Sequence, residues 1–490
     1  MKRLNPVNTI LFVLFSALLF NGCNEENVTP PVVVPEATEV NKFIYKGLHD
    51  YYLWNNQVTA LSNVKYEKAD SLNAFLNNYT DPQKLFASLL YRYEEVDKWS
   101  FLVDDSKTID DWISGISKTM GYDFMLGRIG NSNDVFGFVR YVFSGSPAEK
   151  AGLKRGDVFL TINDQQLSVS NYQKLLLGTE TYKMGFATIE PQGIKPSLKT
   201  LLMTAIEMQE NPINKDTIFT IDNQKIGYLV YNGFNADFDI QLNDVIKEFK
   251  DAAVDQMVLD LRYNGGGSVL SSIYLASMIY GTDNTKVFAR SMYNSGLEEY
   301  FKQQGGITAL DDYFAKSIDA TDKTPATPIN TLNLKKIYII VSDNTASASE
   351  LLINGLRPYM QVIVVGINTV GKYTGSFTVK DWDENGKVNP NHKYAMQPIV
   401  VKYANVDGVT DFVDGLSPTF KAEEDIANLL PFGDPNETLL KVVLDDIKGA
   451  PVTGMVLKSA KIGLKKVADS HDFKPFANEM YINPKLKHQE

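Results

Sequence analysis

Cysteine and histidine are nearly missing from this sequence, which has one cysteine and four histidines among 490 residues. A single cysteine excludes an intrachain disulfide, and the scattered histidines lack the spacing of a metal site. Basic residues are outnumbered by acidic ones, and the formal net charge is −11, which argues against nucleic acid as a partner. We therefore expect no metal, no cofactor and no nucleic-acid ligand.

The apolar run at the N-terminus, Ile10–Phe20, is too short to span ~30 Å of hydrocarbon as a helix. It follows Lys2 and Arg3 and precedes Cys23, as in a secretory signal. LLFNGC, which ends at Cys23, resembles the lipobox of bacterial lipoproteins, although a simple cleavage site with an incidental thiol is the alternative. The resemblance implies a lipid on Cys23, a flexible acidic tether behind it, and attachment to the outer membrane at the periplasmic face or the cell surface.

The rest of the chain is 44% hydrophobic overall and long enough for about three domains of ~150 residues. Apolar residues recur at helical spacing from 36 to about 103, with Asp81-Pro82 as a helix start. Short strand patterns follow between about 111 and 208. From 216 to about 449 strands alternate with helices, which predicts parallel strands joined by crossover helices.

One serine lies at a tight turn in this last region. The β-branched run 335–341 leads into small polar residues, and 348–356 then has the spacing of a helix with Glu350 in its first turn. Ser347 is thus expected between a strand and a helix start, where unpaired N–H groups can stabilise an oxyanion. That is the position of a nucleophile.

A lysine follows the next strand pattern. Residues 362–367 are apolar, and the glycine-flanked loop behind them, TVGKYTG, carries Lys372, which is 25 positions after Ser347. A helix and a strand fit into that spacing. Two successive parallel strands would therefore bring Ser347 and Lys372 to one edge of a sheet.

These residues resemble the C-terminal-processing (tail-specific) serine peptidases, whose S/T-A-S-A-S-E motif and later Gly-Lys pair match TASASE and Gly371-Lys372. The resemblance implies a Ser–Lys dyad in which the neutral amine of Lys372 accepts the proton of Ser347 and an acyl-enzyme forms. It also implies a crotonase-like α/β core and polypeptide substrates with unstructured C-termini. The family often has a glutamine four residues after the lysine to hold its amine, and this chain has Ser376 there.

An earlier strand pattern ends in DLRYNGGGS, residues 260–268, which resembles the family's D-L-R-x-N-x-G-G signature. Glycines let the backbone approach a ligand closely and turn its N–H groups inward. We assign the oxyanion hole to the N–H group of Gly265 or Gly266 together with that of Ala348. A phosphate-binding loop is the alternative, but the GK[ST] ending of a P-loop is missing.

Residues 144–167, SGSPAEKAGLKRGDVFLTINDQQL, resemble the PDZ signature. PDZ domains add an extended peptide as a strand to a sheet edge and hold its carboxylate on backbone N–H groups. The alternative is a small β domain that only packs against its neighbours. The expected peptide-binding residues are Gly121, Tyr122, Asp123 and Phe124.

The predicted fold class is multidomain α+β, with a crotonase-like peptidase core, a PDZ-like β domain and a small N-terminal helical domain. A catalytically weak or inactive peptide-binding surface lipoprotein is the main alternative function, and His392 is an alternative base. The tail shows nothing that looks catalytic. The predicted segments are 1–23 signal peptide, 24–35 tether, 36–110 helical domain, 111–208 PDZ-like domain, 209–449 Ser–Lys peptidase domain and 450–490 C-terminal extension.

Membrane attachment is predicted to depend on Cys23, because a diacylglycerol anchor needs a thiol and the chain has only one. Cys23→Ala should move the protein into the soluble fraction or leave it unprocessed, as measured by detergent partitioning and the mass of the mature chain. Unchanged partitioning together with an unchanged mature mass would show that Cys23 carries no lipid.

Overall fold

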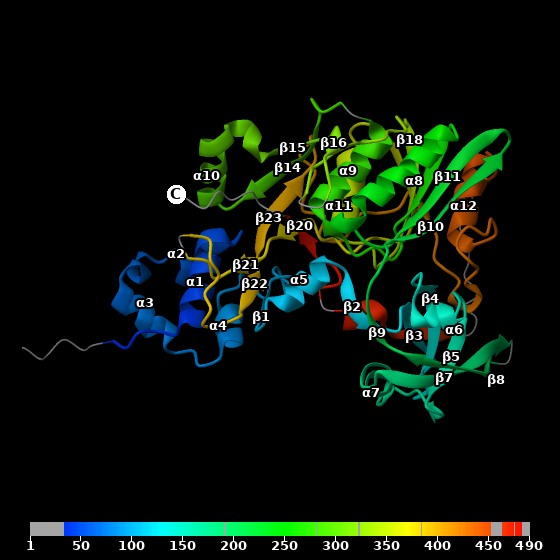
Figure 1. Ribbon diagram of the computed structural model, residues 1–490, viewed down its shortest axis with the longest axis horizontal. Coiled ribbons are helices and arrows are strands. Elements are labelled where there is room, and N and C mark those ends of the chain that lie inside the picture. The colour runs from blue at the N-terminus through cyan, green and yellow to red at the C-terminus, as the bar shows by residue number, and fades with distance from the viewer. Residues whose placement is uncertain are drawn as a thin grey trace, which may run out of the picture.

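The computed structural model describes residues 34–190, 193–281, 283–321, 324–383, 385–451, 463–474 and 476–482. Cys23, the predicted signal peptide and all but the end of the predicted tether lie outside these residues. In Figure 1 a helical domain (blue) lies at one end of an elongated molecule, and a β domain (cyan to teal) lies below a larger α/β core. None of the helices in the described ranges has the length and apolarity that a membrane span requires.

The N-terminal domain is helical because its apolar residues fall on one side of each helix. The first helix buries Phe43, Ile44 and Leu48, and the predicted start at Asp81-Pro82 is confirmed, with Asp81 capping the helix. The helices are α1 (Glu39–Tyr51), α2 (Thr59–Ser62), α3 (Ala69–Leu76) and α4 (Pro82–Ser88). A short strand, β1 (Phe101–Val103), then pairs with β22 (Ala395–Gln397) and ties this domain to the core.

The β domain is an antiparallel sheet in the order β25-β3-β4-β5-β7-β8. Its strands are β3 (Tyr122–Ile129), β4 (Phe136–Val142), β5 (Val158–Ile162), β7 (Thr181–Glu190), β8 (Gly193–Thr204) and β25 (Leu464–Asp469). Two short helices, α6 (Pro147–Ala151) and α7 (Tyr172–Leu177), accompany it, and β6 (Gln165–Gln166) pairs with β5. The edge strand β25 comes from the C-terminal part of the chain, so this domain is not built from one continuous segment.

A connecting ribbon lies between the β domain and the core. It consists of α5 (Lys107–Ile113), β2 (Ile116–Thr119) and β9 (Ile206–Gln209), and the two strands pair antiparallel. The chain therefore enters the β domain along β2 and leaves it along β9 side by side, and β25 adds a further connection from the C-terminal part of the chain.

The core contains the predicted parallel strands. Its first sheet has the order β10-β11-β12-β18-β19-β24, in which β11, β12, β18 and β19 are parallel neighbours. Residues of α8, α9 and α11 are buried with one face of this sheet, and residues of α12 with the other. The strands are β10 (Ile213–Ile221), β11 (Gln224–Tyr231), β12 (Gln256–Asp260), β18 (Lys336–Val341), β19 (Gln361–Gly366) and β24 (Phe420–Lys421). The helices are α8 (Asp239–Asp251), α9 (Val269–Tyr280), α11 (Ala348–Leu356) and α12 (Thr438–Ile447).

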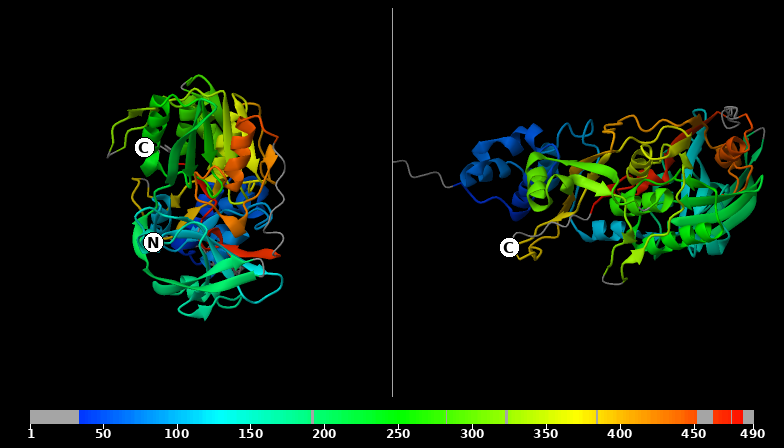
Figure 2. Two further views of the ribbon diagram at one scale, coloured as in Figure 1. Left: turned by 90° about the vertical axis from the view of Figure 1, so that its right-hand side faces the viewer. Right: turned by 90° about the horizontal axis from the view of Figure 1, so that it is seen from above.

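A second six-stranded sheet completes the core, in the order β13-β26-β20-β23-β14-β15. Its strands are β13 (Gly267–Ser268), β26 (Met480–Tyr481), β20 (Thr374–Ser376), β23 (Ile399–Ala404), β14 (Val287–Tyr293) and β15 (Asp311–Tyr313). The smaller elements are α10 (Ser295–Gly305), β16 (Ser317–Ile318), β17 (Thr327–Pro328) and β21 (Val379–Lys380). Figure 2 shows the helical domain continuing from the end of the core that carries α10.

The strand β12 leads into a buried group of charges around Arg262. The Arg262 side chain has no exposed surface and forms ion pairs with Asp260 at 2.6 Å, Glu437 at 2.7 Å and Glu424 at 2.7 Å. Glu437 caps α12, so the guanidinium joins the end of β12 to that helix. Asp260 and Arg262 therefore brace the loop that follows β12.

Replacing Arg262 should strongly destabilise the fold. Arg262→Ala leaves the buried carboxylate of Asp260 without its counter-charge and leaves Glu424 and Glu437 to pair with Arg155, so we expect the free energy of unfolding to fall by about 3–5 kcal/mol. Urea denaturation followed by circular dichroism measures it. The matched control is Arg290→Ala, because Arg290 also pairs with an aspartate, at 2.7 Å, but its side chain is 54% exposed. That change should cost less than about 1 kcal/mol. Equal losses for the two variants would contradict the bracing role.

Candidate active site

Ser347 lies at the turn between β18 and α11, as the sequence predicts. Its backbone has φ of 67° and ψ of −117°, a conformation that is costly for a residue with a side chain. The residue is fully buried in the described structure, and its hydroxyl makes no hydrogen bond there. A strained turn that presents an unpaired hydroxyl is typical of a nucleophilic serine.

The strained turn is pinned to the loop that follows β12. The hydroxyl of Thr345 donates to the carbonyl of Leu261 at 2.8 Å. The N–H of Ala346 and the hydroxyl of Ser349 both donate to the carbonyl of Asn264, each at 3.1 Å. The small polar residues of TASASE therefore fix the turn against the glycine loop.

The glycine loop lies directly against Ser347. A β-carbon at Gly266, where φ is +117°, would be 2.6 Å from Cβ of Ser347, so only glycine fits. The Gly266 N–H already donates to Oδ1 of Asn264 at 2.9 Å, which engages one of the two glycine donors assigned to the oxyanion hole. Ala348 begins α11, where a helix leaves N–H groups without intrahelical partners. The Gly265 and Ala348 N–H groups remain the candidate oxyanion donors.

Glu350 joins the serine turn to the lysine loop. Its Oε2 accepts from the N–H groups of Ser347 at 2.7 Å and Lys372 at 2.9 Å. Its Oε1 accepts from the N–H of Gly371 at 2.7 Å and the hydroxyl of Thr369 at 2.5 Å. Burial raises the pKa of this carboxyl, and the four donors oppose that rise. One carboxylate thus fixes the backbones of the predicted nucleophile and base relative to each other.

Lys372 is 1% exposed, as a catalytic lysine requires. Its ammonium nitrogen lies 4.8 Å from the centre of the Trp99 ring, which the helical domain contributes. Burial lowers the pKa of the Lys372 amine, while the nearby carboxylate of Glu479 opposes the shift. Nζ lies 2.7 Å from Oε2 of Glu479 in an ion pair that is not aligned as a hydrogen bond.

Glu479 was missed by sequence reasoning, and the expectation that the C-terminal extension holds nothing of catalytic interest is corrected here. The residue is 3% exposed and directly precedes β26, which lies between the strands that follow the glycine loop and the lysine. Its carbonyl also accepts from the N–H of Gly267 at 2.8 Å. No local motif marks Glu479, because it lies 107 positions after Lys372.

Ser376 does not touch the lysine amine through any contact in the described structure. Its hydroxyl instead lies 3.3 Å from Oε2 of Glu479 and 3.1 Å from the carbonyl of Met480. Ser376 therefore supports Glu479, and Glu479 rather than Ser376 contacts the amine.

His392, the alternative base, lies elsewhere. Its Nε2 is 3.1 Å from Asp381, and its ring packs 5.4 Å from that of Phe43 on α1. Within the described ranges, no three histidine, cysteine or acidic side chains are arranged to hold a metal ion.

The predicted peptide-binding residues lie at the start of β3. Asp123 is buried and ion-paired with Arg140. The Gly121 N–H donates to the hydroxyl of Thr119 at 3.0 Å, and the Phe124 N–H donates to the hydroxyl of Ser470 at 2.6 Å. Two of the N–H groups expected to bind a peptide carboxylate are thus already occupied.

Comparison with known proteins gives three matching family models. Residues 225–398 match peptidase family S41, residues 39–101 match the peptidase S41 N-terminal domain, and residues 138–181 match the PDZ domain. The fold class predicted from the sequence is confirmed by these matches.

The curated relatives of this chain include C-terminal processing peptidases. The chain is 25% identical over 294 residues to the chloroplastic C-terminal processing peptidase of Tetradesmus obliquus, covering 58% of this chain and 56% of that protein. It is 25% identical over 300 residues to the carboxy-terminal processing protease CtpA of Bacillus subtilis, covering 60% and 55%. The chain therefore matches little more than half the length of these relatives.

One solved structure shares the fold over nearly its whole length. It is described as an S41 protease from Bacteroides fragilis, has 22% sequence identity and a TM-score of 0.65, and covers 86% of this chain and 99% of that one. At this identity the similarity establishes the fold.

Proposed function

Because this chain belongs to peptidase family S41, the family of the C-terminal processing proteases, we propose that it is a serine endopeptidase that works through a Ser347–Lys372 dyad. Its substrates are extracytoplasmic polypeptides with unstructured C-termini. The dyad acts without a metal or cofactor.

The observation that carries this proposal is the shared carboxylate of Glu350. A single oxygen, Oε2, accepts from the backbone N–H groups of both Ser347 and Lys372. Two residues that are 25 positions apart are thereby held at one point, with one unpaired hydroxyl and one buried amine. Such juxtaposition is what nucleophilic catalysis by serine requires.

In the proposed reaction the neutral amine of Lys372 accepts the proton of Ser347 while Oγ bonds to the peptide carbonyl carbon. The Ala348 and Gly265 N–H groups stabilise the oxyanion. When the C–N bond breaks, the lysine ammonium returns its proton to the leaving amine, and an acyl-enzyme remains. Water then attacks the ester, gives a proton to Lys372, and the C–Oγ bond breaks as Ser347 regains its hydrogen.

The PDZ-like domain is proposed to capture the polypeptide at the β3 edge, and Cys23 is proposed to anchor the enzyme to the cell envelope. The first proposal is supported by the match of residues 138–181 to the PDZ domain. The second depends on the sequence around Cys23 alone.

A binding lipoprotein without turnover is the second candidate. It is favoured by one observation, which is that the Ser347 hydroxyl makes no hydrogen bond to Lys372 in the described structure. Protein lacking residues 1–23, incubated with reduced and alkylated casein, separates the candidates. Cleavage supports the peptidase, and binding without cleavage supports the second candidate.

Hydrolysis should depend on both members of the dyad. Ser347→Ala should lower kcat by at least ~10³-fold, because the nucleophile is deleted. Lys372→Arg should lose as much, since arginine stays protonated and cannot accept the proton. The wild-type rate should rise with pH along one ionisation, because the neutral amine is the active form. Its midpoint should fall below the ordinary lysine value of about 10.4, because burial lowers the pKa of Lys372.

The control is His392→Ala, which should stay within a few-fold of the wild-type rate because His392 contacts Asp381 and Phe43. Initial rates from pH 5 to pH 10 on one quenched fluorescent peptide measure all three variants. An active Lys372→Arg enzyme, or a folded but inactive His392→Ala enzyme, would assign the base to the histidine.

A further inference from the structure

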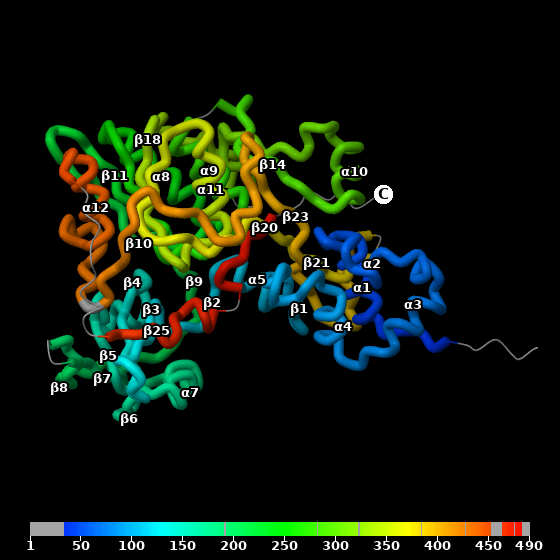
Figure 3. The backbone as a smooth tube through the Cα atoms, turned by 180° about the vertical axis from the view of Figure 1, so that it is seen from behind, coloured from blue at the N-terminus to red at the C-terminus, as the bar shows by residue number. Residues whose placement is uncertain are grey.

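The C-terminal segment, residues 463–474 and 476–482, passes through both the β domain and the active site. Figure 3 shows it (red) beginning at β25 beside β3 and ending next to β20. Its last strand, β26, pairs with β13 through Met480 and Tyr481 and with β20 through Tyr481. The segment therefore crosses between the glycine loop and the lysine loop.

Glu479 is fixed at this crossing from both sides. Its carbonyl accepts from Gly267, and its carboxylate accepts from the hydroxyl of Ser376 at 3.3 Å. A β-carbon at Gly266 would lie 2.6 Å from Cβ of Ser347 and 3.0 Å from the carbonyl oxygen of Glu479. The backbone of Glu479 thus lies close to the glycine that faces the nucleophile.

We propose that Glu479 is the positioning residue for Lys372, supplied by the C-terminal segment in place of a residue on the lysine's own loop. Oε2 of Glu479 lies 2.7 Å from Nζ, and the Trp99 ring lies 4.8 Å from the same nitrogen. These two groups hold the amine, which has no exposed surface on its side chain. The proposal rests on the Ser347–Lys372 dyad.

The electrostatics of the pair fit this role. Burial raises the pKa of the Glu479 carboxyl, and the positive charge of Lys372 opposes this rise. Burial lowers the pKa of the Lys372 amine, and the negative charge of Glu479 opposes this fall. Desolvation therefore favours the uncharged forms of both groups, including the neutral amine that the base step needs. Asp97 and Glu350 also face the amine and add to the attraction for its charged form.

Two variants of Glu479 test the role. Glu479→Gln keeps a group that can accept from the amine but removes the negative charge, so kcat should stay within a few-fold. The acid limb of its pH–rate profile should move to lower pH by about one unit or more, because an opposite charge raises a lysine pKa by that amount. Glu479→Ala leaves the amine unheld, and kcat should fall at least tenfold with little change in KM.

The control is Glu423→Gln, the same substitution at an exposed glutamate, which should leave rate and profile unchanged. A Glu479→Gln profile that superimposes on the wild-type profile, or a Glu479→Ala enzyme with the wild-type kcat, would overturn the proposal. If cleavage survives Ser347→Ala, the dyad itself fails instead, so the two failures are distinguishable.

The strand β25 supports a second, independent inference. It pairs antiparallel with β3, from Leu464 opposite Ile129 to Asp469 opposite Met125. It thus approaches the predicted carboxylate loop in the direction of a peptide added to a PDZ edge. Beyond it, Ser470 both accepts from the N–H of Phe124, at 2.6 Å, and donates to its carbonyl, at 3.0 Å.

Aromatic packing also makes this segment resemble a bound peptide. The ring of Phe473 lies 6.3 Å from that of Phe124 and 6.0 Å from that of Tyr172 on α7. Ala468 is buried in the core of the β domain. The strand and the residues that follow it therefore fill both the edge of β3 and the space towards α7.

We infer that residues 464–474 are a tethered ligand of the PDZ-like domain, so that an extended polypeptide binds the β3 edge only in exchange with them. A tethered strand competes at high effective concentration, and weakening it should raise the affinity for a free peptide. Because Glu479 follows on the same segment, displacement of residues 464–474 would also affect the position of the carboxylate that contacts Lys372.

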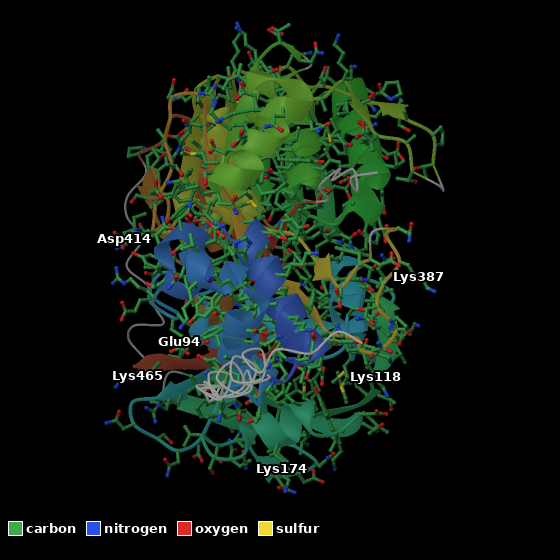
Figure 4. The ribbon with its side chains drawn as sticks, turned by 90° about the vertical axis from the view of Figure 1, so that its left-hand side faces the viewer. Glu94, Lys118, Lys174, Lys387, Asp414 and Lys465 are labelled. Atoms are coloured by element: carbon green, nitrogen blue, oxygen red, sulfur yellow. The ribbon has the colours of Figure 1, made fainter. Side chains whose placement is uncertain are left out.

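The test uses the Ser347→Ala chain, which excludes cleavage, and a fluorescent peptide with the sequence of residues 464–474. Adding Ser470→Ala and Phe473→Ala to the chain should tighten binding at least tenfold by fluorescence anisotropy. The control is Lys387→Ala, outside residues 464–474, since Figure 4 labels Lys387 and its side chain is exposed, and this change should leave the affinity unchanged.

Hydrogen exchange on the chain with intact Ser470 and Phe473 gives a second measurement that needs no folded double variant. Excess peptide should accelerate exchange of the amides of residues 464–469. Equal affinities for the two chains, absence of binding to both, or unchanged exchange would overturn the inference.

Discussion

The assembly of the candidate active site depends on the burial of one amine, that of Lys372. A lysine with no exposed side-chain surface costs several kcal/mol unless it finds partners or becomes neutral. The partners of Lys372 come from separate parts of the chain: Trp99 from the helical domain, Glu350 from α11 and Glu479 from the C-terminal segment. The site is therefore complete only when the N-terminal, central and C-terminal parts have assembled.

The second constraint is the strained backbone of Ser347 and the hydrogen bonds that hold its turn in place. The positive φ of Ser347 would be unfavourable in isolation, and the neighbouring hydrogen bonds from Thr345, Ala346 and Ser349 to the β12 loop hold it in place. The carboxylate of Glu350 then ties that turn to the lysine loop. The two loops lie at the same end of β18 and β19 because those strands are parallel.

The C-terminal segment connects the β3 edge to Lys372 by covalent continuity. Between Ser470 at the β3 edge and Glu479 at Lys372 there are few residues to absorb a displacement. Phe476 stacks on Phe101 with ring centres 3.7 Å apart, which fixes the segment midway.

Local sequence patterns were enough to predict much of the fold of this protein. The TASASE and Gly-Lys motifs marked Ser347 and Lys372 as candidate catalytic residues. Their spacing, which fits one helix and one strand, predicted that both lie at one edge of the sheet, because crossover units follow fixed rules of direction and length. Periodicity and turn residues predicted the helical, strand-rich and α/β regions, and the resemblance of residues 144–167 to the PDZ signature predicted the type of the strand-rich domain. Sequence alone could not assign Ser376 correctly, since its partner is a side chain far along the chain.

Tertiary structure alone decided what lies against the amine and against the β3 edge. Glu479 and Leu464–Asp469 have no motif, because their roles depend on long-range strand pairing that local composition does not encode. The sequence determined which groups are the candidates for the chemistry. The packing of the C-terminal segment determined which carboxylate lies against the lysine amine, because a buried charge takes its partner from whichever segment the fold brings within reach.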